Sequence, residues 1–318
     1  MHYLVTGGAG FIGSSLADRL LGLGHKVTAF DNFSTGLRPF VESALRNPNY
    51  RLVEGDLLDE AAIQSAANGC DFVFHLAANA DVRFGTNHPR KDLEQNTIAT
   101  FNVLEAARLN GVKGLAFSST GSVYGEAAVI PTPEDAPFPI QTSLYAASKL
   151  AGEGLLAAYS EGFGIPTYIF RFVSILGPRY THGHVYDFYR KLKADPSRLT
   201  VLGNGRQKKS YLHIDDCIGA MLTVIERAGA KVNIFNLGTD EYCEIVNSVG
   251  WICEEMDVRP ELSYTGGERG WIGDNPFIYL DTKKVRALGW RPQFTIEQGV
   301  RNTLNWLKDN DWVYEFRS

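Results

Sequence analysis

The stretch VTGGAGFIG, residues 5–13, most constrains what this chain can fold into. It follows a short apolar run, HYLVT, and opens a segment whose apolar residues recur at helical spacing. Glycines at positions 7, 10 and 13 permit a tight turn, a close backbone approach and close packing of a helix on a strand. A strand that passes through such a turn into a helix predicts an α/β fold with a doubly wound parallel sheet.

The same alternation continues through the first half of the chain. Apolar runs of strand character alternate with segments of helical spacing that mostly end at glycine. The predicted strands cover residues 2–6, 26–30, 51–53, 71–76, 114–119 and 167–170, and the predicted helices cover 11–24, 60–68, 93–111 and 143–164. This order predicts a parallel sheet covered by helices on both faces. After Arg171 the regularity ends, and one further amphipathic helix is predicted over 296–310.

Composition excludes several classes of function. The 318 residues carry a formal net charge of -5, so no basic field for nucleic acid is expected. No apolar run approaches the roughly 18 residues of a membrane-spanning helix, and no signal peptide is recognisable. Four widely spaced cysteines show no metal or disulfide spacing, so we expect no metal site and reduced core thiols in a cytoplasmic protein. They are Cys70, Cys217, Cys243 and Cys253.

The glycine turn is a candidate phosphate site, because the amides at a helix N-terminus attract anions. The alternative is a turn that binds nothing. Asp31 ends the second predicted strand, 18 residues after Gly13, where a carboxylate can accept from both ribose hydroxyls and would repel a 2′-phosphate. NAD is therefore favoured over NADP. Asp56 could accept from the adenine amino group, and the small residues of LAA (76–78) could lie beside the cofactor, although packing or capping would also explain them.

The segment LYAASK places Tyr145 and Lys149 four residues apart, and therefore on one helical face. Alone, this spacing is also typical of an exposed surface turn. The neighbouring motifs decide between the two. In order, TGGAGFIG, DNFSTG, GDL, HLAA, Asn96, FSSTGSVYGE and YAASK resemble the extended short-chain dehydrogenase/reductase superfamily, and within it the UDP-galactose 4-epimerases and their relatives acting on nucleotide sugars. The resemblance runs from residue 1 to about LGWRP (288–292).

The resemblance implies roles for these residues. Tyr145 would be the acid/base, and Lys149 would hold the nicotinamide ribose and lower the pKa of Tyr145. That pKa must fall by about 3 units for work near neutral pH, or roughly 4 kcal/mol. Thr120 would align the sugar hydroxyl, with Ser118 and Ser119 as rivals. The implied cofactor contacts are Gly7, Gly10, Phe11, Ile12, Gly13, Asp31, Asn32, Asp56, Leu57, Leu76, Ala77, Ala78, Asn96, Ser118, Tyr145 and Lys149.

The residues after Thr120 bear on the type of reaction. Related dehydratases and decarboxylases commonly carry an acidic residue two places after this Ser/Thr, whereas this chain has Gly121 and Ser122. Dehydration is therefore disfavoured. The resemblance implies 4-epimerisation of a nucleotide sugar of the UDP-glucose/UDP-galactose type through a 4-keto intermediate. Alternatives are a 4-dehydrogenase, an epimerase for a uronate, acetamido or heptose substrate, and a non-catalytic NAD(H)-binding protein.

The resemblance also implies two domains, with the active site between them: an NAD-binding Rossmann domain (1–172) and a smaller nucleotide-sugar-binding α/β lobe (173–318), parts of which pack back on the first. Lys209 is the first candidate for the diphosphate, although the usual Arg-Asp pair is Lys-Ser here. Arg269 is the second candidate, and a solvated surface arginine is the alternative. Ser174 stands where epimerases commonly have Asn. We expect a homodimer formed through helices 93–111 and 143–164.

Overall fold

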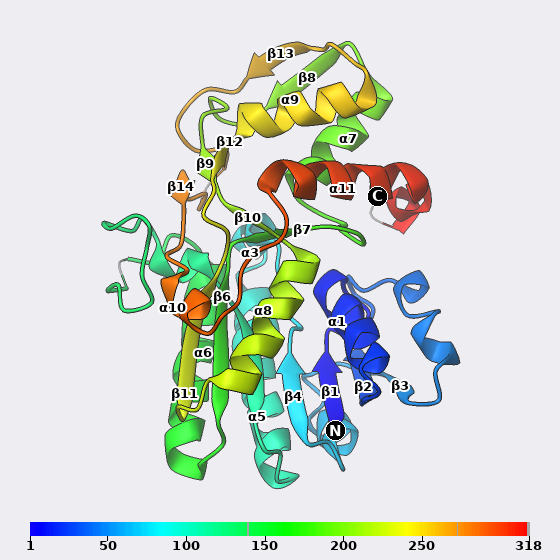
Figure 1. The fold of residues 1–318 in the computed structure, drawn as a ribbon, viewed down its shortest axis with the longest axis vertical. Coiled ribbons are helices and arrows are strands. Elements are labelled where there is room, and N and C mark those ends of the chain that lie inside the picture. The colour runs from blue at the N-terminus through cyan, green and yellow to red at the C-terminus, as the bar shows by residue number, and fades with distance from the viewer. Residues whose placement is uncertain (139, 272, 317–318) are drawn as a thin grey trace. The chain divides into compact units, whose positions relative to one another are not determined.

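The computed structural model describes residues 1–138, 140–271 and 273–316 (Figure 1). Contacts between Cα atoms divide the chain into two compact units. The first unit comprises Met1–Val123, Ser143–Arg171 and Val224–Phe235, and the second comprises Tyr124–Thr142, Phe172–Thr223 and Asn236–Ser318.

The first unit is built on a seven-stranded sheet with the order β11-β6-β5-β4-β1-β2-β3. Pairing is parallel between β1 and β2, β1 and β4, β2 and β3, and β4 and β5. The strands are β1 (His2–Thr6), β2 (Lys26–Asp31), β3 (Tyr50–Glu54), β4 (Phe72–His75), β5 (Leu115–Thr120), β6 (Thr167–Phe172) and β11 (Val232–Leu237). The predicted parallel α/β sheet is therefore confirmed.

Helices cover both faces of this sheet. They are α1 (Phe11–Gly22), α2 (Glu60–Ala67), α3 (Val82–Asn87), α4 (Pro89–Asp92), the π-helix η3 (Leu93–Ile98), α5 (Ala99–Leu109) and α6 (Leu144–Phe163), with short 3₁₀ turns η1 (Arg38–Phe40), η2 (Ala44–Arg46) and η4 (Gly121–Tyr124). Helix α1 packs on β1 and β2. On the opposite face, α2 and α5 pack against each other and contribute to one apolar core.

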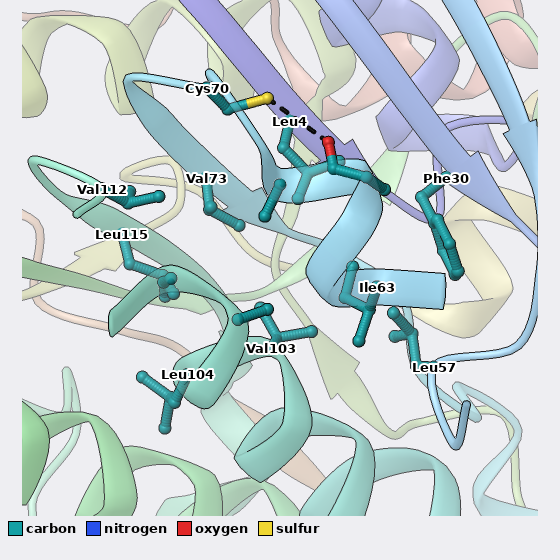
Figure 2. Packing of buried hydrophobic residues seen from close by; sticks show 14 of the residues in the cluster. Leu4, Phe30, Leu57, Ile63, Cys70, Val73, Val103, Leu104, Val112 and Leu115 are labelled. Atoms are coloured by element: carbon teal, nitrogen blue, oxygen red, sulfur yellow. Dashed lines mark hydrogen bonds between the residues drawn. The ribbon is translucent and has the colours of Figure 1, made fainter. Parts of the chain in front are cut away.

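Figure 2 shows the apolar core that joins the sheet to α2 and α5. Val73 of β4 and Leu115 of β5 lie in the same cluster as Ile63 of α2 and Val103 of α5. All four side chains are fully buried. Because both sheet faces are covered, the strands are almost continuously apolar rather than alternating, as expected for buried parallel strands. This packing fixes the carboxyl ends of β1, β2, β4 and β5, where the candidate site lies.

The second unit was predicted poorly, because its elements are short and irregular. Only its closing amphipathic helix, α11, was expected from the sequence. The elements are β7 (Ser174–Leu176), α7 (His184–Ala194), β8 (Arg198–Val201), β9 (Lys208–Lys209), β10 (Tyr211–His213), α8 (Ile214–Arg227), β12 (Cys243–Glu244), α9 (Ile245–Met256), β13 (Glu261–Tyr264), β14 (Phe277–Ile278), α10 (Lys283–Ala287), α11 (Ile296–Asp309) and η5 (Asp311–Phe316). The end of α8, from Val224, belongs to the first unit.

Two expected absences can be compared with the described residues. Within residues 1–138, 140–271 and 273–316, no helix is long and apolar enough to cross a bilayer. The same residues contain no group of three or more His, Cys, Asp or Glu side chains that could hold a metal ion. All four cysteines are free thiols, and three are buried; Cys253 is only partly buried, so it is not a core thiol.

Candidate active site

The glycine turn between β1 and α1 has no room for side chains. Gly7 has φ +68°, and its amide donates to the carbonyl of Phe30 at 2.9 Å. A Cβ on Gly7 would lie 2.8 Å from the backbone nitrogen of Ala77, and a Cβ on Gly13 would lie 2.1 Å from the carbonyl oxygen of Gly7. The turn is further closed by Gly10, whose amide donates to Gly7 at 3.0 Å. The bare backbone at the start of α1 is what a pyrophosphate needs.

Asp31 ends β2 beside this turn. Its Oδ2 accepts from the amide of Ala9 at 2.9 Å, and its Oδ1 accepts from the amide of Phe33 at 2.8 Å. Burial raises the pKa of Asp31, and the two backbone hydrogen bonds lower it in part. Each carboxylate oxygen keeps further acceptor capacity, which suits a pair of ribose hydroxyls.

The other adenine-side candidates lie on the neighbouring strand ends. The Asn32 amide donates to Oδ2 of Asp56 at 3.0 Å, so the sequence motifs DN and GD meet. The backbone oxygen of Leu57 accepts from Asn102 of α5 at 2.9 Å. At the start of α1, Phe11 is buried and Ile12 is half-buried. Three residues that follow β4 are also half-buried: Leu76, Ala77 and Ala78.

The start of α6 carries the predicted Tyr–Lys pair. Ser143 caps the helix by accepting from the amide of Ala146 at 3.1 Å. Tyr145 is half-buried, and Lys149, one turn later, is fully buried. The Lys149 ammonium donates to the carbonyl of Ser118 at 2.7 Å and lies 4.6 Å from the Phe117 ring centroid. The two side chains are therefore anchored to the end of β5.

Of the three candidate hydroxyls, Thr120 is the one that hydrogen-bonds the Tyr145 side chain. The Ser118 hydroxyl donates instead to the carbonyl of His75 at 3.3 Å. The Ser119 hydroxyl points to Glu153, to which it donates a short hydrogen bond. The alternation of β5 explains why Ser119 differs from the other two, because successive side chains face opposite sides of the sheet. Thr120, at the strand end, lies beside the phenol.

Burial shifts the pKa values of both Tyr145 and Lys149 toward their neutral forms. Burial raises the pKa of Tyr145 to about 12; the hydrogen bond with Thr120 lowers it, and the Asp92 carboxylate raises it. Burial lowers the pKa of Lys149 to about 7, while Glu153 and then Asp92 raise it. Burial thus opposes the fall in the Tyr145 pKa that the resemblance implies.

Asn96, a predicted cofactor contact, is fully engaged within the protein. Its Oδ1 accepts from the amide of Asn79 at 2.8 Å. Its Nδ2 donates to Asp92 at 3.2 Å and to the Ser148 hydroxyl at 3.0 Å. The Ser148 hydroxyl in turn donates to the carbonyl of Tyr145 at 2.8 Å. Asn96 therefore links η3 to the first turns of α6, which carry Tyr145 and Lys149.

Sequence reasoning missed three buried charged residues around α6, which are Asp92, Glu153 and Arg171. Arg171 donates to Glu153 through Nε at 3.0 Å and through Nη2 at 2.7 Å. The spacing offered a signal, because Glu153 follows Lys149 by four residues and Asp92 precedes Asn96 by four. His75 and His213 are also buried.

The substrate candidates lie in the second unit. Lys209, on β9, is nearly buried and donates to Asp274 at 2.7 Å. Arg269 forms an ion pair with Glu126, and both side chains are about half exposed. Ser174, at the start of β7, is exposed. Both cations thus already have carboxylate partners, so an incoming diphosphate would share or replace those partners.

A doubly wound parallel sheet, a bare glycine turn with a carboxylate beside it, and a Tyr–Lys pair at the end of β5 define a class. They are the parts of an NAD-binding short-chain dehydrogenase/reductase. The chain belongs to the NAD dependent epimerase/dehydratase family, whose model matches residues 3–238. Its cofactor is NAD, and the glycine turn and Asp31 fit that group.

Individual relatives agree with this family. A putative UDP-glucose 4-epimerase from Methanocaldococcus jannaschii is 31% identical over 315 residues, which cover 97% of this chain and 99% of that protein. A crystal structure of a UDP-galactose 4-epimerase, 39% identical, has a TM-score of 0.88 and covers 98% of this chain and 100% of its own. The UDP-glucuronic acid 4-epimerase from Bacillus cereus, solved with UDP-glucuronic acid and NAD, is 26% identical with a TM-score of 0.89, over 97% of this chain and 99% of that one.

Proposed function

We propose that this protein is an NAD-dependent 4-epimerase of a nucleotide sugar of the UDP-glucose/UDP-galactose type. The observation that carries the proposal is the contact of Thr120 with Tyr145, one helical turn from the buried Lys149. A hydroxyl, a phenol and a cation in this arrangement form a device for removing and returning the proton of a secondary alcohol.

In the proposed reaction, Tyr145 as the phenolate accepts the proton of the sugar C4 hydroxyl and later returns it. Thr120 aligns that hydroxyl, which shortens the search for a reactive geometry. Lys149 stabilises the phenolate and holds the nicotinamide ribose. Bound NAD supplies the acceptor and later the donor of the C4 hydride. Asp31 and Asn32 hold the adenine-side ribose, and the glycine turn holds the pyrophosphate.

The absence of acid groups after Thr120 favours epimerisation over dehydration. Gly121 and Ser122 follow Thr120 in η4, and neither carries a carboxylate to protonate a leaving hydroxyl. The second unit supplies the proposed diphosphate contacts, Lys209 and Arg269. Ser174 has a shorter side chain than Asn, so the exact hexose is the least constrained part of the proposal.

The test is incubation of purified protein with UDP-galactose or UDP-glucose, followed by separation of the sugars. Interconversion is expected in both directions without added NAD. UDP-glucuronic acid and UDP-N-acetylglucosamine in parallel reactions test the alternative sugars. If UDP-glucuronic acid or UDP-N-acetylglucosamine is epimerised and neither UDP-glucose nor UDP-galactose is, the hexose assignment is wrong and the assignment as an epimerase stands.

A variant of Tyr145 tests the mechanism. Tyr145→Phe should keep its NAD and lose activity by at least about a hundredfold, as expected for loss of a general acid/base. The matched control is Tyr168→Phe, which removes a phenol from β6 in the same unit and should leave turnover unchanged. Normal turnover in Tyr145→Phe would remove this residue from the mechanism.

We also propose that the protein acts as a homodimer. Several large apolar side chains on η3, α5 and α6 are exposed, and a second copy would cover them. They are Leu93, Ile98, Phe101, Leu109, Leu144 and Phe163. Phe101→Glu should convert the dimer to a monomer in size-exclusion chromatography with light scattering. A wild-type protein that is monomeric at micromolar concentration would contradict this.

A further inference from the structure

Asp92 is a buried acid for which the proposed reaction has no stated use. It ends α4, directly before the π-helix η3, and only 1% of it is exposed. Its Oδ1 accepts from the amides of Asn79 at 2.8 Å and Asn96 at 3.2 Å. Among the side chains that the structure describes, its Oδ2 has no hydrogen-bond partner, and it lies against Gly85, where an added Cβ would be only 1.9 Å away. The donors to this carboxylate among the described side chains are therefore the neutral amides of Asn79 and Asn96.

The hydrogen bonds connect Asp92 to the catalytic turn. Asn96 receives its orientation from Asp92 and Asn79, and it donates to the Ser148 hydroxyl at 3.0 Å. Ser148 donates to the carbonyl of Tyr145 at 2.8 Å. The chain of contacts from Asp92 thus ends on the first turn of α6, between the phenol and the lysine.

Among the described residues, the buried charges around α6 balance when Asp92 is counted. Arg171 and Glu153 form a two-point ion pair, with exposed side-chain fractions of 1% and 5%. Lys149 is the second buried cation, and Asp92 is the second buried anion. Without the Asp92 charge, these four groups would carry an excess positive charge. Arg171 cannot release a proton, whereas Lys149 can.

We propose that Asp92 is a positioning residue of the active site: its buried carboxylate keeps Lys149 protonated and fixes Asn79 and Asn96 against the catalytic helix. This inference deepens the proposed function and rests on it. Other charged groups act on the same centre. Glu153 also raises the pKa of Lys149, Asp81 raises that of Asp92, and Lys149 lowers that of Asp92. The buried His75 faces the same lysine, and burial lowers its pKa to about 3, so it is neutral near neutral pH. Tyr145 lies one turn before Lys149 on α6, and burial raises its pKa.

Asp92→Asn separates charge from shape. The amide oxygen can still accept from Asn79 and Asn96, and only the negative charge is lost. The pKa of Lys149 should then fall by about one unit, the low end for loss of an opposite charge in a buried site. The same loss should lower the pKa of Tyr145. Both limbs of the pH profile of kcat/KM should therefore move to lower pH, because they report the coupled pair.

Two measurements test this. The first is an NMR titration of lysine labelled with ¹³C at Cε, in NAD-free and NAD-loaded protein, with the Lys149 signal assigned through Lys149→Met. The second is the pH profile of turnover. The matched control is Asp81→Asn, which removes an exposed carboxylate from the same region and should leave the Lys149 titration in place.

A lower Lys149 pKa in Asp92→Asn, with a shifted profile and unchanged NAD content, supports the proposal. An unchanged Lys149 titration overturns it, even if turnover falls at every pH, because a purely structural role would lower the rate without moving the profile. The lysine titration does not need turnover. If the wild type converts no nucleotide sugar, the proposed function fails while the assignment of Asp92 is still decided.

Discussion

The ion pair between Glu153 and Arg171 allows a quantitative prediction. Both side chains are almost completely buried, and two hydrogen bonds of 3.0 and 2.7 Å join them. In Glu153→Gln, an amide NH₂ takes the place of one acceptor oxygen and either faces the Arg171 donors or displaces the Ser119 hydroxyl. Loss of one partner leaves an uncompensated buried charge, which costs about 3–5 kcal/mol of the free energy of unfolding.

The double replacement Glu153→Leu with Arg171→Met provides the control. It removes both charges and keeps apolar volume, so the loss should be within about 1–2 kcal/mol, far less than in the single variant. Urea unfolding of both variants and the wild type, followed by circular dichroism at 25 °C, measures these differences. A cost below about 1 kcal/mol for Glu153→Gln, or an equal loss in the double and single variants, would show that no uncompensated buried charge is left.

Two further predictions concern the cofactor side and the lysine. Asp31→Ala should weaken NAD binding by at least about tenfold and narrow the preference for NAD over NADP, because the acceptor for the ribose hydroxyls is gone; fluorescence titration with both cofactors measures this, and unchanged affinities would contradict it. Lys149 has a pKa of about 7 in the folded protein against 10.5 unfolded, so the unfolded chain binds more protons between these values. The stability of NAD-free wild type relative to Lys149→Met should therefore rise with pH across this window, by at most about 1.4 kcal/mol per pH unit, and be flat below it. Denaturant unfolding at several pH values measures this. If the difference in the free energy of unfolding between wild type and Lys149→Met were the same at every pH, Lys149 would not be a buried lysine that loses its proton in this window.

The predictable parts of the fold are those that depend on residues close together in the sequence. The strand of residues 2–6, the glycine turn and the placement of Tyr145 and Lys149 on one helix all follow from spacing and turn chemistry. The predicted helix 93–111 was only partly right, because its first six residues form the π-helix η3. This segment packs on α6, and its Asn96 accepts from the amide of Asn79, which lies 17 residues away in sequence. Local spacing does not indicate such contacts.

Long-range electrostatics was the part that sequence could not supply. Arg171 meets Glu153 across 18 residues, and Lys209 meets Asp274 across 65. No periodicity or motif indicates such pairs, since a charge on a strand or helix is usually solvated. The same limit applies to Thr120, because only the folded structure shows which of the three adjacent hydroxyls meets Tyr145.

The π-helix Leu93–Ile98 has a consequence for how this segment tolerates change. Each residue of an α-helix advances the chain by about 100° around the axis, and a π turn accommodates one residue more than an α turn. Deleting one residue there would let the helix tighten to an α-helix and would rotate Asp92 away from the Asn96 amide that it orients. We therefore expect homologues to differ in the residue types of this segment more often than in its length.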